Sequence, residues 1–342
     1  MEAIHTLEIA VTLFFQSLGQ WLIVPMRAAS FLGQEEFYLL MMPALYWSVD
    51  ASIGIRMGMM LLLTQFSSTF FKLLGQSPRP YWFDPRVQAF STETSFGLPS
   101  GHSLSSAGIF GLLAAKLRQR RVTVIMLVVI FLVGISRIYL GVHFLTDVLA
   151  GWTIGGLLVL LFTRFDAPVS TWVERRTLGQ QFLLAAGSSL AIILLSLLTF
   201  ALTPAFMLPQ TWVANSLRAA PEVTIDPLNL DGIFTIAGTW FGLLAGASWL
   251  RKRYGVFEAA GKPLHRLARY AVGAVGVFLL WYGLGAVLPR NEDIISYVLR
   301  YARYTLIGVW ISALAPLLFV RLGISHWNSN PPRSIQTAQN PI

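Results

Sequence analysis

Long apolar stretches separated by short polar loops dominate the hydrophobic pattern of the chain. Several of them approach the roughly 20 residues that an α-helix needs to cross a bilayer, and none shows the period-two alternation of barrel strands. We therefore predict an all-α polytopic membrane helix bundle. The predicted segments are 7–25, 36–50, 54–74, 102–117, 122–140, 145–163, 180–202, 231–249, 267–288 and 303–322.

Three of these segments have features that complicate a full crossing. The first contains Glu8, Gln16 and Gln20, so it either spans the bilayer or lies at its interface as an amphipathic helix. The segments 36–50 and 102–117 are short, which indicates helices that are tilted or sheltered by their neighbours.

The polar stretch 164–180 divides the predicted segments into two groups. We expect a six-helix core at 1–163 and about four additional transmembrane helices at 164–322. The remaining residues, 323–342, include two adjacent prolines and few apolar side chains, so we expect a disordered cytoplasmic tail.

The composition agrees with a membrane protein, since 55% of the 342 residues are hydrophobic and only 12% are charged. The net charge of +9 does not indicate a nucleic-acid partner, because the basic residues lie in short loops rather than on one face. The runs at 116–121 and 251–253 are typical of cytoplasmic loops. This orientation puts the motif-bearing loops on the external face, and we predict the cytoplasmic membrane of a bacterium. The sequence has no cysteine, and it leaves the oligomeric state open.

Three polar regions carry the candidate chemistry, and the first is the end of segment 54–74 with the loop that follows. Lys72 and Arg79 are two cations that can neutralise a phosphoryl group. Pro78 and Pro80 flank Arg79 and stiffen its loop. Taken alone, the pair also fits a lysine that snorkels at a helix end and a solvated loop arginine.

The second polar region leads directly into segment 102–117 and predicts a helix N-terminus. Ser100 can cap the helix, and Gly101 allows close approach of a ligand to the first backbone N–H groups, where phosphate binds readily. His102 follows and can donate a proton near neutral pH. An ordinary capped helix with an interfacial histidine is the alternative.

The third polar region contains Arg137, His143 and Asp147. The spacing of four puts His143 and Asp147 on one helical face, where a carboxylate can fix the imidazole tautomer and leave the other nitrogen free to attack phosphorus. The alternative is an acidic first helical turn next to an interfacial aromatic residue. Ionisable residues near membrane depth are costly and usually functional.

Together the three regions supply cations, a helix N-terminus and two histidines, which suit phosphoryl transfer. No acidic cluster with metal-ligand spacing accompanies them, so we predict a pocket that uses neither metal nor cofactor.

These residues resemble the three-part pattern of the type 2 phosphatidic acid phosphatase superfamily, which includes glucose-6-phosphatases and haloperoxidases. The matching parts are Lys72 with Arg79-Pro80, then Pro99-Ser100-Gly101-His102, then Ser136-Arg137 with His143 and Asp147. The stretches 75–82 and 93–108 also look like the glucose-6-phosphatase and sphingosine-phosphate phosphatase branches.

The resemblance implies a membrane phosphatase in which His143 forms a phosphohistidine, Asp147 orients it, and His102 protonates the leaving group. Lys72, Arg79, Ser100, Gly101 and Arg137 would bind the phosphoryl oxygens. The implied substrate is a lipid that carries a phosphate monoester or a terminal pyrophosphate, such as undecaprenyl pyrophosphate, phosphatidic acid, phosphatidylglycerol phosphate or a sphingoid phosphate.

Two alternatives remain open at this point. A phosphotransferase would pass the group from the same intermediate to a sugar or lipid acceptor, and a transporter would merely hold an anion or phospholipid. Five residues of the loop after Arg79 could contact a headgroup, but aromatic residues beside a membrane surface are common anchors, so we place all five outside the site. They are Tyr81, Trp82, Asp84, Arg86 and Glu93.

Overall fold

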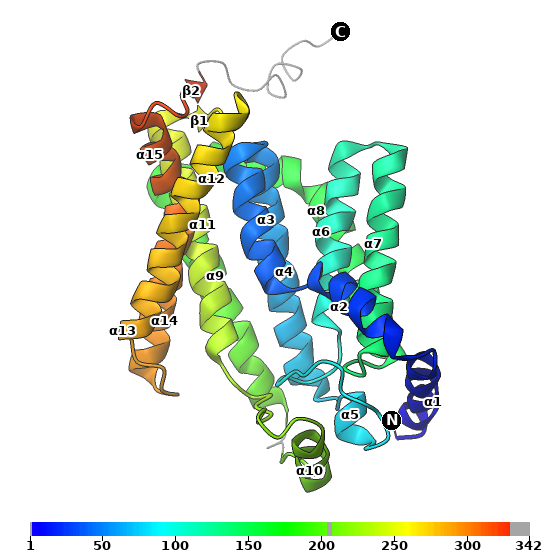
Figure 1. Ribbon diagram of the computed structural model, residues 1–342. Coiled ribbons are helices and arrows are strands. Elements are labelled where there is room, and N and C mark those ends of the chain that lie inside the picture. The colour runs from blue at the N-terminus through cyan, green and yellow to red at the C-terminus, as the bar shows by residue number, and fades with distance from the viewer. Residues whose placement is uncertain (1, 204–206, 329–342) are drawn as a thin grey trace. The chain divides into compact units, whose positions relative to one another are not determined.

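The computed structural model describes residues 2–203 and 207–328, and these are almost entirely helical (Figure 1). The predicted all-α fold is confirmed. The helices of the first half are α1 (Glu2–Ser17), α2 (Ile23–Phe31), α3 (Glu35–Ser48), α4 (Ala51–Gly75), α5 (Pro80–Phe83), α6 (Gly101–Leu117), α7 (Arg120–Tyr139) and α8 (Leu145–Glu174). The later elements are α9 (Leu178–Leu202), α10 (Gln210–Ala219), α11 (Asp231–Tyr254), β1 (Val256–Phe257), α12 (Pro263–Phe278), α13 (Leu284–Val287), α14 (Ile294–Val309), α15 (Ala315–Arg321) and β2 (Trp327–Asn328).

Within the described residues, seven helices are long and apolar enough to cross a membrane, or eight if one bent pair counts as a single span. The short predicted segments correspond to α3, with 14 residues, and α6, with 17 residues. Both are shorter than the roughly 20 residues of a full crossing. Residues 329–342 of the predicted disordered tail lie outside the described residues, whereas Trp327 and Asn328 form β2, which pairs antiparallel with β1.

The first predicted segment, 7–25, is not one continuous helix. The chain turns by 88° between Ile4–Ser17 and Gln20–Phe31. Gly19 lies at this break with a φ of 108°, a conformation that L side chains rarely adopt. The glycine therefore breaks the helix within an apolar stretch that hydropathy alone predicts as one continuous segment.

The faces of α1 have the reverse of the usual polarity of a helix on a soluble protein. His5, Glu8 and Thr12 share its buried face, whereas Leu7 is 73% exposed and Phe14 is 62% exposed. This arrangement fits a helix whose outer face contacts lipid and whose inner face makes specific polar contacts.

Two boundaries differ from the prediction for identifiable local reasons. Helix α8 continues to Glu174, beyond the predicted end at residue 163, and its Asp166 pairs with Lys116 at 2.7 Å. Helix α14 begins at Ile294 rather than near residue 303, because the Asp293 side chain caps it by accepting a hydrogen bond from the Ser296 N–H at 2.7 Å. Helix α10 lies between the predicted segments 180–202 and 231–249, where no helix was predicted.

The chain forms two compact units, neither of which is continuous in sequence. The first comprises the residues up to Leu40 together with Met57–Trp172 and Leu190–Ile236, and the second comprises Met41–Arg56, Val173–Ser189 and the residues from Ala237 onward. These units follow packing rather than sequence order, so the predicted division at residue 163 stays a prediction.

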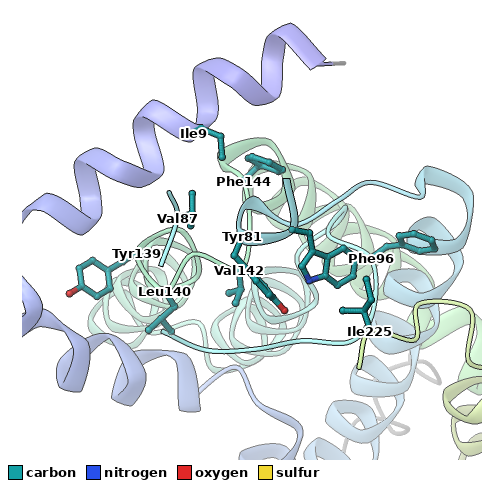
Figure 2. Packing of buried hydrophobic residues seen from close by; sticks show 10 residues of the cluster. Ile9, Tyr81, Val87, Phe96, Tyr139, Leu140, Val142, Phe144 and Ile225 are labelled. Carbon is teal, nitrogen blue, oxygen red and sulfur yellow. The ribbon is translucent and has the colours of Figure 1, made fainter. Parts of the chain in front are cut away.

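In the first unit, α6 packs against α7, α2 packs against α7, and α10 packs against α5 (Figure 1). An apolar cluster lies among the loops at the end of these helices (Figure 2). Its buried members are Ile9, Tyr81, Trp82, Val87, Phe96, Tyr139, Leu140, Val142, Phe144 and Ile225. Residues from α1, α5, α7 and the segment after α10 thus share one core, which holds the connecting loops in place.

The second unit has its own core and a buried arginine that joins its segments. Arg269 of α12 is 2% exposed and donates hydrogen bonds to the carbonyl groups of Trp47 at 2.7 Å and Ile324 at 2.8 Å. It also donates to the carbonyls of Ala259 and Ala260. One guanidinium therefore satisfies backbone acceptors from three separate stretches of chain.

We predict that Arg269→Gln destabilises the protein by about 2 kcal/mol or more, because several buried carbonyl groups lose their donor. Thermal unfolding in detergent micelles checks this, with Arg253→Gln, a change at an exposed arginine, as the matched control. An unfolding temperature of Arg269→Gln equal to that of the control would contradict the assigned role.

Candidate active site

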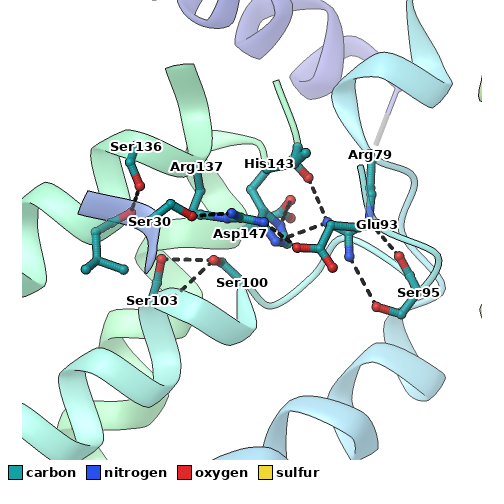
Figure 3. A network of polar contacts seen from close by, with 12 residues as sticks. Ser30, Arg79, Glu93, Ser95, Ser100, Ser103, Ser136, Arg137, His143 and Asp147 are labelled. Carbon is teal, nitrogen blue, oxygen red and sulfur yellow. Dashed lines mark hydrogen bonds and ion pairs between the residues drawn. The ribbon is translucent and has the colours of Figure 1, made fainter. Parts of the chain in front are cut away.

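The three predicted polar regions meet at one end of the first unit (Figure 3). Arg79 precedes α5, Ser100 caps α6, and His143 lies between α7 and α8. Residues that are far apart in the sequence thus become neighbours.

Arg79 is fully buried and is the most connected side chain of this cluster. Its guanidinium donates to the Ser95 carbonyl at 2.6 Å, the Val142 carbonyl at 2.9 Å and the Phe96 carbonyl at 3.0 Å. It also contacts Nε2 of His143 at 3.1 Å and the Ser95 hydroxyl at 3.2 Å. Most of these partners are neutral carbonyl groups, so its positive charge remains available to an anion.

Lys72 lies in the last turn of α4 and is partly exposed. Its Nζ donates to the Ser95 hydroxyl at 2.8 Å. Because Arg79 donates to the same hydroxyl, Ser95 holds the two predicted phosphate-binding cations beside each other.

Arg137, at the end of α7, is buried and faces a carboxylate. Its Nη1 donates to the Ser30 hydroxyl at 2.6 Å, and its Nη2 forms an ion pair with Glu93. Burial alone would raise the pKa of Glu93, but the positive charges of Arg137 and Arg79 outweigh it and lower that pKa to about 2. Glu93 is therefore ionised at neutral pH.

His143 and Asp147 are both buried and form the predicted pair. Nδ1 of His143 lies 3.2 Å from Oδ2 of Asp147, which also accepts a hydrogen bond from the Phe144 N–H at 2.9 Å. With the proton on Nδ1, Nε2 carries the lone pair and accepts from Arg79. Burial and the charges of Arg79 and Arg137 lower the pKa of His143 well below its usual value, so the imidazole is neutral.

Ser100 is the N-cap of α6, as predicted from the sequence. Its hydroxyl oxygen accepts from the Ser103 N–H at 3.3 Å and from the Ser103 hydroxyl at 2.9 Å. Its own N–H donates to the Asp147 carbonyl at 2.9 Å, which ties the start of α6 to the start of α8. Gly101 and His102 follow in the first turn of α6 and are partly exposed. Nε2 of His102 has no hydrogen-bond partner among the residues that the structure describes.

Gly97 shows how tightly the site loops pack. A Cβ at this position would lie 2.4 Å from the Pro78 carbonyl oxygen and 3.0 Å from Oδ2 of Asp147. The glycine therefore allows the loop of Arg79 to approach the loop of Ser100.

Three residues that contact the predicted cations were not predicted as part of the site. Glu93 was placed outside the site, but it pairs with Arg137. Ser95 and Ser30 were not predicted to have a role, but their hydroxyls accept hydrogen bonds from the cations. Glu93 and Ser95 precede the Ser100 motif by only a few residues, which is the one local signal that could have indicated them.

Helix α1 contacts the residues on both sides of the His143–Asp147 pair. Glu8 accepts from the Thr146 N–H at 2.6 Å and from the Thr146 hydroxyl at 3.1 Å. His5 stacks on Phe144, with 4.4 Å between the ring centroids, and its Nδ1 lies 3.5 Å from Glu8. An acidic residue within an apolar segment was the sequence signal for this contact.

Two family models match separate parts of the chain. Residues 54–169 match the PAP2 superfamily, and residues 234–327 match the PAP2 superfamily phosphatase transmembrane extension. The chain belongs to the PAP2 superfamily. The first match contains the residues of all three polar regions, whereas α1 and α10 lie outside both matches.

The PAP2 chain is similar to named phosphatases from bacteria and animals. It is 40% identical over 92 residues to phosphatidylglycerophosphatase B of Bacillus subtilis (strain 168), covering 24% of this chain and 45% of that protein. It is 25% identical over 334 residues to sphingosine-1-phosphate phosphatase 2 of Homo sapiens, covering 86% and 76%. The chain thus spans less than half the length of the Bacillus subtilis relative.

One solved structure is also similar, the crystal structure of the first transmembrane PAP2 type phosphatidylglycerolphosphate phosphatase from Bacillus subtilis. It is 28% identical, with 49% of this chain and 89% of that chain covered and a TM-score of 0.44. Family membership and the apolar helices make the chain an integral membrane protein. The bacterial origin and the external position of the site stay predictions.

We predict that His143 of this PAP2 protein stays neutral well below the usual histidine pKa of about 6.5. Because the folded-state pKa is lowered, the neutral imidazole persists as the pH falls through the range in which an exposed histidine becomes charged. Histidine side-chain NMR of 15N-labelled protein in micelles checks this, with His143→Gln to assign the signal. A His143 signal that titrates near pH 6.5 would contradict the prediction.

Proposed function

We propose that this protein is a metal-independent membrane phosphatase that hydrolyses a phosphate monoester or terminal pyrophosphate of a lipid through a phosphohistidine at His143. The observation that carries the proposal is the environment of that imidazole. Nδ1 faces the Asp147 carboxylate, and Nε2 faces the guanidinium of Arg79. The nucleophilic nitrogen is thus directed to the group that would bind a phosphoryl oxygen.

In the first step, Nε2 of His143 attacks phosphorus, and the bond from phosphorus to the leaving oxygen breaks. The imidazole becomes positively charged as the N–P bond forms, and the adjacent Asp147 stabilises that charge. Negative charge develops on the phosphoryl oxygens, where Lys72, Arg79 and Arg137 act as fixed cations.

His102 is the proposed proton donor to the leaving oxygen. It follows the Ser100 cap, is partly exposed, and has an Nε2 without a partner among the described residues. In the second step the same imidazole accepts a proton from water, whose oxygen attacks phosphorus and breaks the N–P bond. Phosphate leaves, and both histidines return to their starting protonation states.

The proposed substrate class rests on the membrane setting and on the relatives. The site lies at the ends of apolar helices, so an amphiphile can present its headgroup while its tail stays in lipid. The two similar proteins described above are named for a glycerophospholipid phosphate and for sphingosine 1-phosphate. Both names describe lipids with a phosphate monoester.

We predict that His143→Ala lowers phosphate release from lipid phosphates by at least about 10³-fold, because the covalent route is lost. The measurement is phosphate release by purified protein in mixed micelles, with phosphatidic acid, phosphatidylglycerol phosphate, sphingosine 1-phosphate, undecaprenyl pyrophosphate and glucose 6-phosphate as substrates. Vanadate should inhibit the native protein, and EDTA should not.

His326→Ala is the matched control for this prediction, because His326 is exposed and lies outside the cluster. Acid-quenched protein should retain radiolabelled phosphate in the control and lose it in His143→Ala. Full activity of His143→Ala would sink the proposal. If the native protein prefers glucose 6-phosphate, the proposed phosphohistidine mechanism stands but the proposed lipid substrate is rejected.

We also predict that Glu8→Gln lowers kcat about tenfold, which corresponds to roughly 1.4 kcal/mol, with KM changed less than about twofold. The reason is that Glu8 acts through Thr146 on the start of α8, where Asp147 lies, and does not contact the predicted phosphate-binding cations. Steady-state kinetics check the split between kcat and KM.

Glu222→Gln is the control for Glu8→Gln, since Glu222 is an exposed carboxylate outside the cluster. Glu8→Asp should recover part of kcat, because it restores the negative charge near the N-terminus of α8. A change confined to KM, or a loss of activity explained by lower thermal stability, would contradict a positioning role.

A further inference from the structure

Glu93 is the one acidic side chain that forms an ion pair with the predicted phosphate-binding cations among the described residues. The mechanism proposed above does not use it. Its carboxylate pairs with Nη2 of Arg137, and Figure 3 shows it reaching into the cluster from the loop that also carries Ser95. The positive charges of Arg79 and Lys72 act on it as well. A phosphoryl group would need the same donors.

The two partners of this ion pair differ in their freedom to move. The Arg137 side chain is 1% exposed and is also held by Ser30, whereas the Glu93 side chain is 27% exposed. The backbone of Glu93 is fixed independently, because the Tyr81 hydroxyl donates to its carbonyl at 2.9 Å and accepts from its N–H at 3.1 Å. The carboxylate can therefore rotate away without a change in the loop.

The charges of the cluster indicate how the Glu93 carboxylate would affect a phosphate that binds there. Glu93 pairs with Arg137, and the positive charges of Arg79 and Lys72 also act on it, so this carboxylate already offsets part of the positive charge of the cluster. A phosphate dianion that enters this cluster either displaces Glu93 from Arg137 or lies beside it as a like charge. Both outcomes weaken phosphate binding relative to a pocket in which residue 93 is neutral.

We propose that Glu93 is a specificity-determining residue that competes with the phosphoryl group for Arg137 and so limits retention of the inorganic phosphate product. A pocket with three cations and a helix N-terminus would otherwise bind free phosphate tightly. The carboxylate acts as an internal competitor, which a phosphorylated lipid overcomes through its additional tail contacts and free phosphate does not. This inference rests on the proposed function of the site as a phosphatase pocket.

The test is direct binding of orthovanadate and of inorganic phosphate to purified protein in micelles by calorimetry. Glu93→Gln keeps an acceptor for Arg137 but removes the charge, and it should bind both anions at least about tenfold more tightly than the native protein. Inorganic phosphate should become a correspondingly stronger product inhibitor. Glu93→Asp keeps the charge but withdraws it by one methylene, so it should show a smaller increase in affinity.

Asp84→Asn is the matched control, because Asp84 is a carboxylate of the same loop that pairs with the exposed Arg86 at 2.7 Å. It should leave anion binding unchanged. Equal or weaker binding by folded Glu93→Gln overturns the inference and assigns Glu93 to holding Arg137 in place. If that variant does not fold, equal or weaker binding by Glu93→Asp overturns it.

Measuring anion binding and phosphate release separately distinguishes a failure of this inference from a failure of the proposed function. Native protein that binds vanadate but releases no phosphate from any substrate rejects the phosphatase, whatever the Glu93 variants do. Native protein that is an active phosphatase, with anion affinity unaltered in Glu93→Gln, rejects only the competition.

Discussion

The hydrogen bonds of Arg79 are the interaction on which the rest of the site depends. A buried guanidinium is costly unless its donors are satisfied, and here the carbonyl groups of Ser95, Phe96 and Val142 satisfy them. Those carbonyls belong to two different loops, so one side chain fixes the distance between them. Because the acceptors are neutral, the cation is held in place without losing its charge to a carboxylate.

The apolar cluster explains why these loops can present so many polar groups in fixed positions. Val142 and Phe144 flank His143 and point into the core, as does Phe96 beside the carbonyls that bind Arg79 (Figure 2). Tyr81 joins the same core and fixes the backbone of Glu93 with its hydroxyl. Burial of these apolar side chains thus anchors each loop in the core and holds the neighbouring polar groups in fixed positions.

The sequence was sufficient for the helices and for the residues whose spacing is local. Apolar length predicted α4, α7, α9 and α11 closely, since a bilayer demands a long apolar stretch of any helix that crosses it. The spacing of four predicted the contact between His143 and Asp147, but not its geometry. His143 lies in the loop before α8, which begins at Leu145, so the contact joins this loop to the first turn of the helix instead of crossing one helical face. The conjunction of three motifs predicted that the three polar regions supply one site, and in the structure Lys72 and Arg79 donate to the same Ser95 hydroxyl.

What the sequence did not predict are contacts that depend on the tertiary path of the chain. Ser30 reaches Arg137 from α2, and Glu8 reaches Thr146 from α1. These pairs of residues are far apart in the sequence, so no helical spacing predicts their contacts. The only sequence signal was a polar residue within an apolar segment. The break at Gly19 was also missed, because hydropathy averages over a single glycine with a φ of 108°.

Glu8 and Glu93 are the two acidic residues whose contacts were not predicted, and the structure shows how they differ. Glu8 is 6% exposed and accepts hydrogen bonds at the start of α8, where a negative charge complements the helix dipole. In the proposed reaction no anionic substrate competes for that N–H, so we expect the contact to persist during turnover. Glu93 instead pairs with a cation that a phosphoryl group also requires, and its side chain is more exposed. Glu8 and Glu93 therefore differ in partner and in exposure: Glu8 is buried against a backbone N–H, whereas Glu93 holds a cation that the proposed substrate would also need.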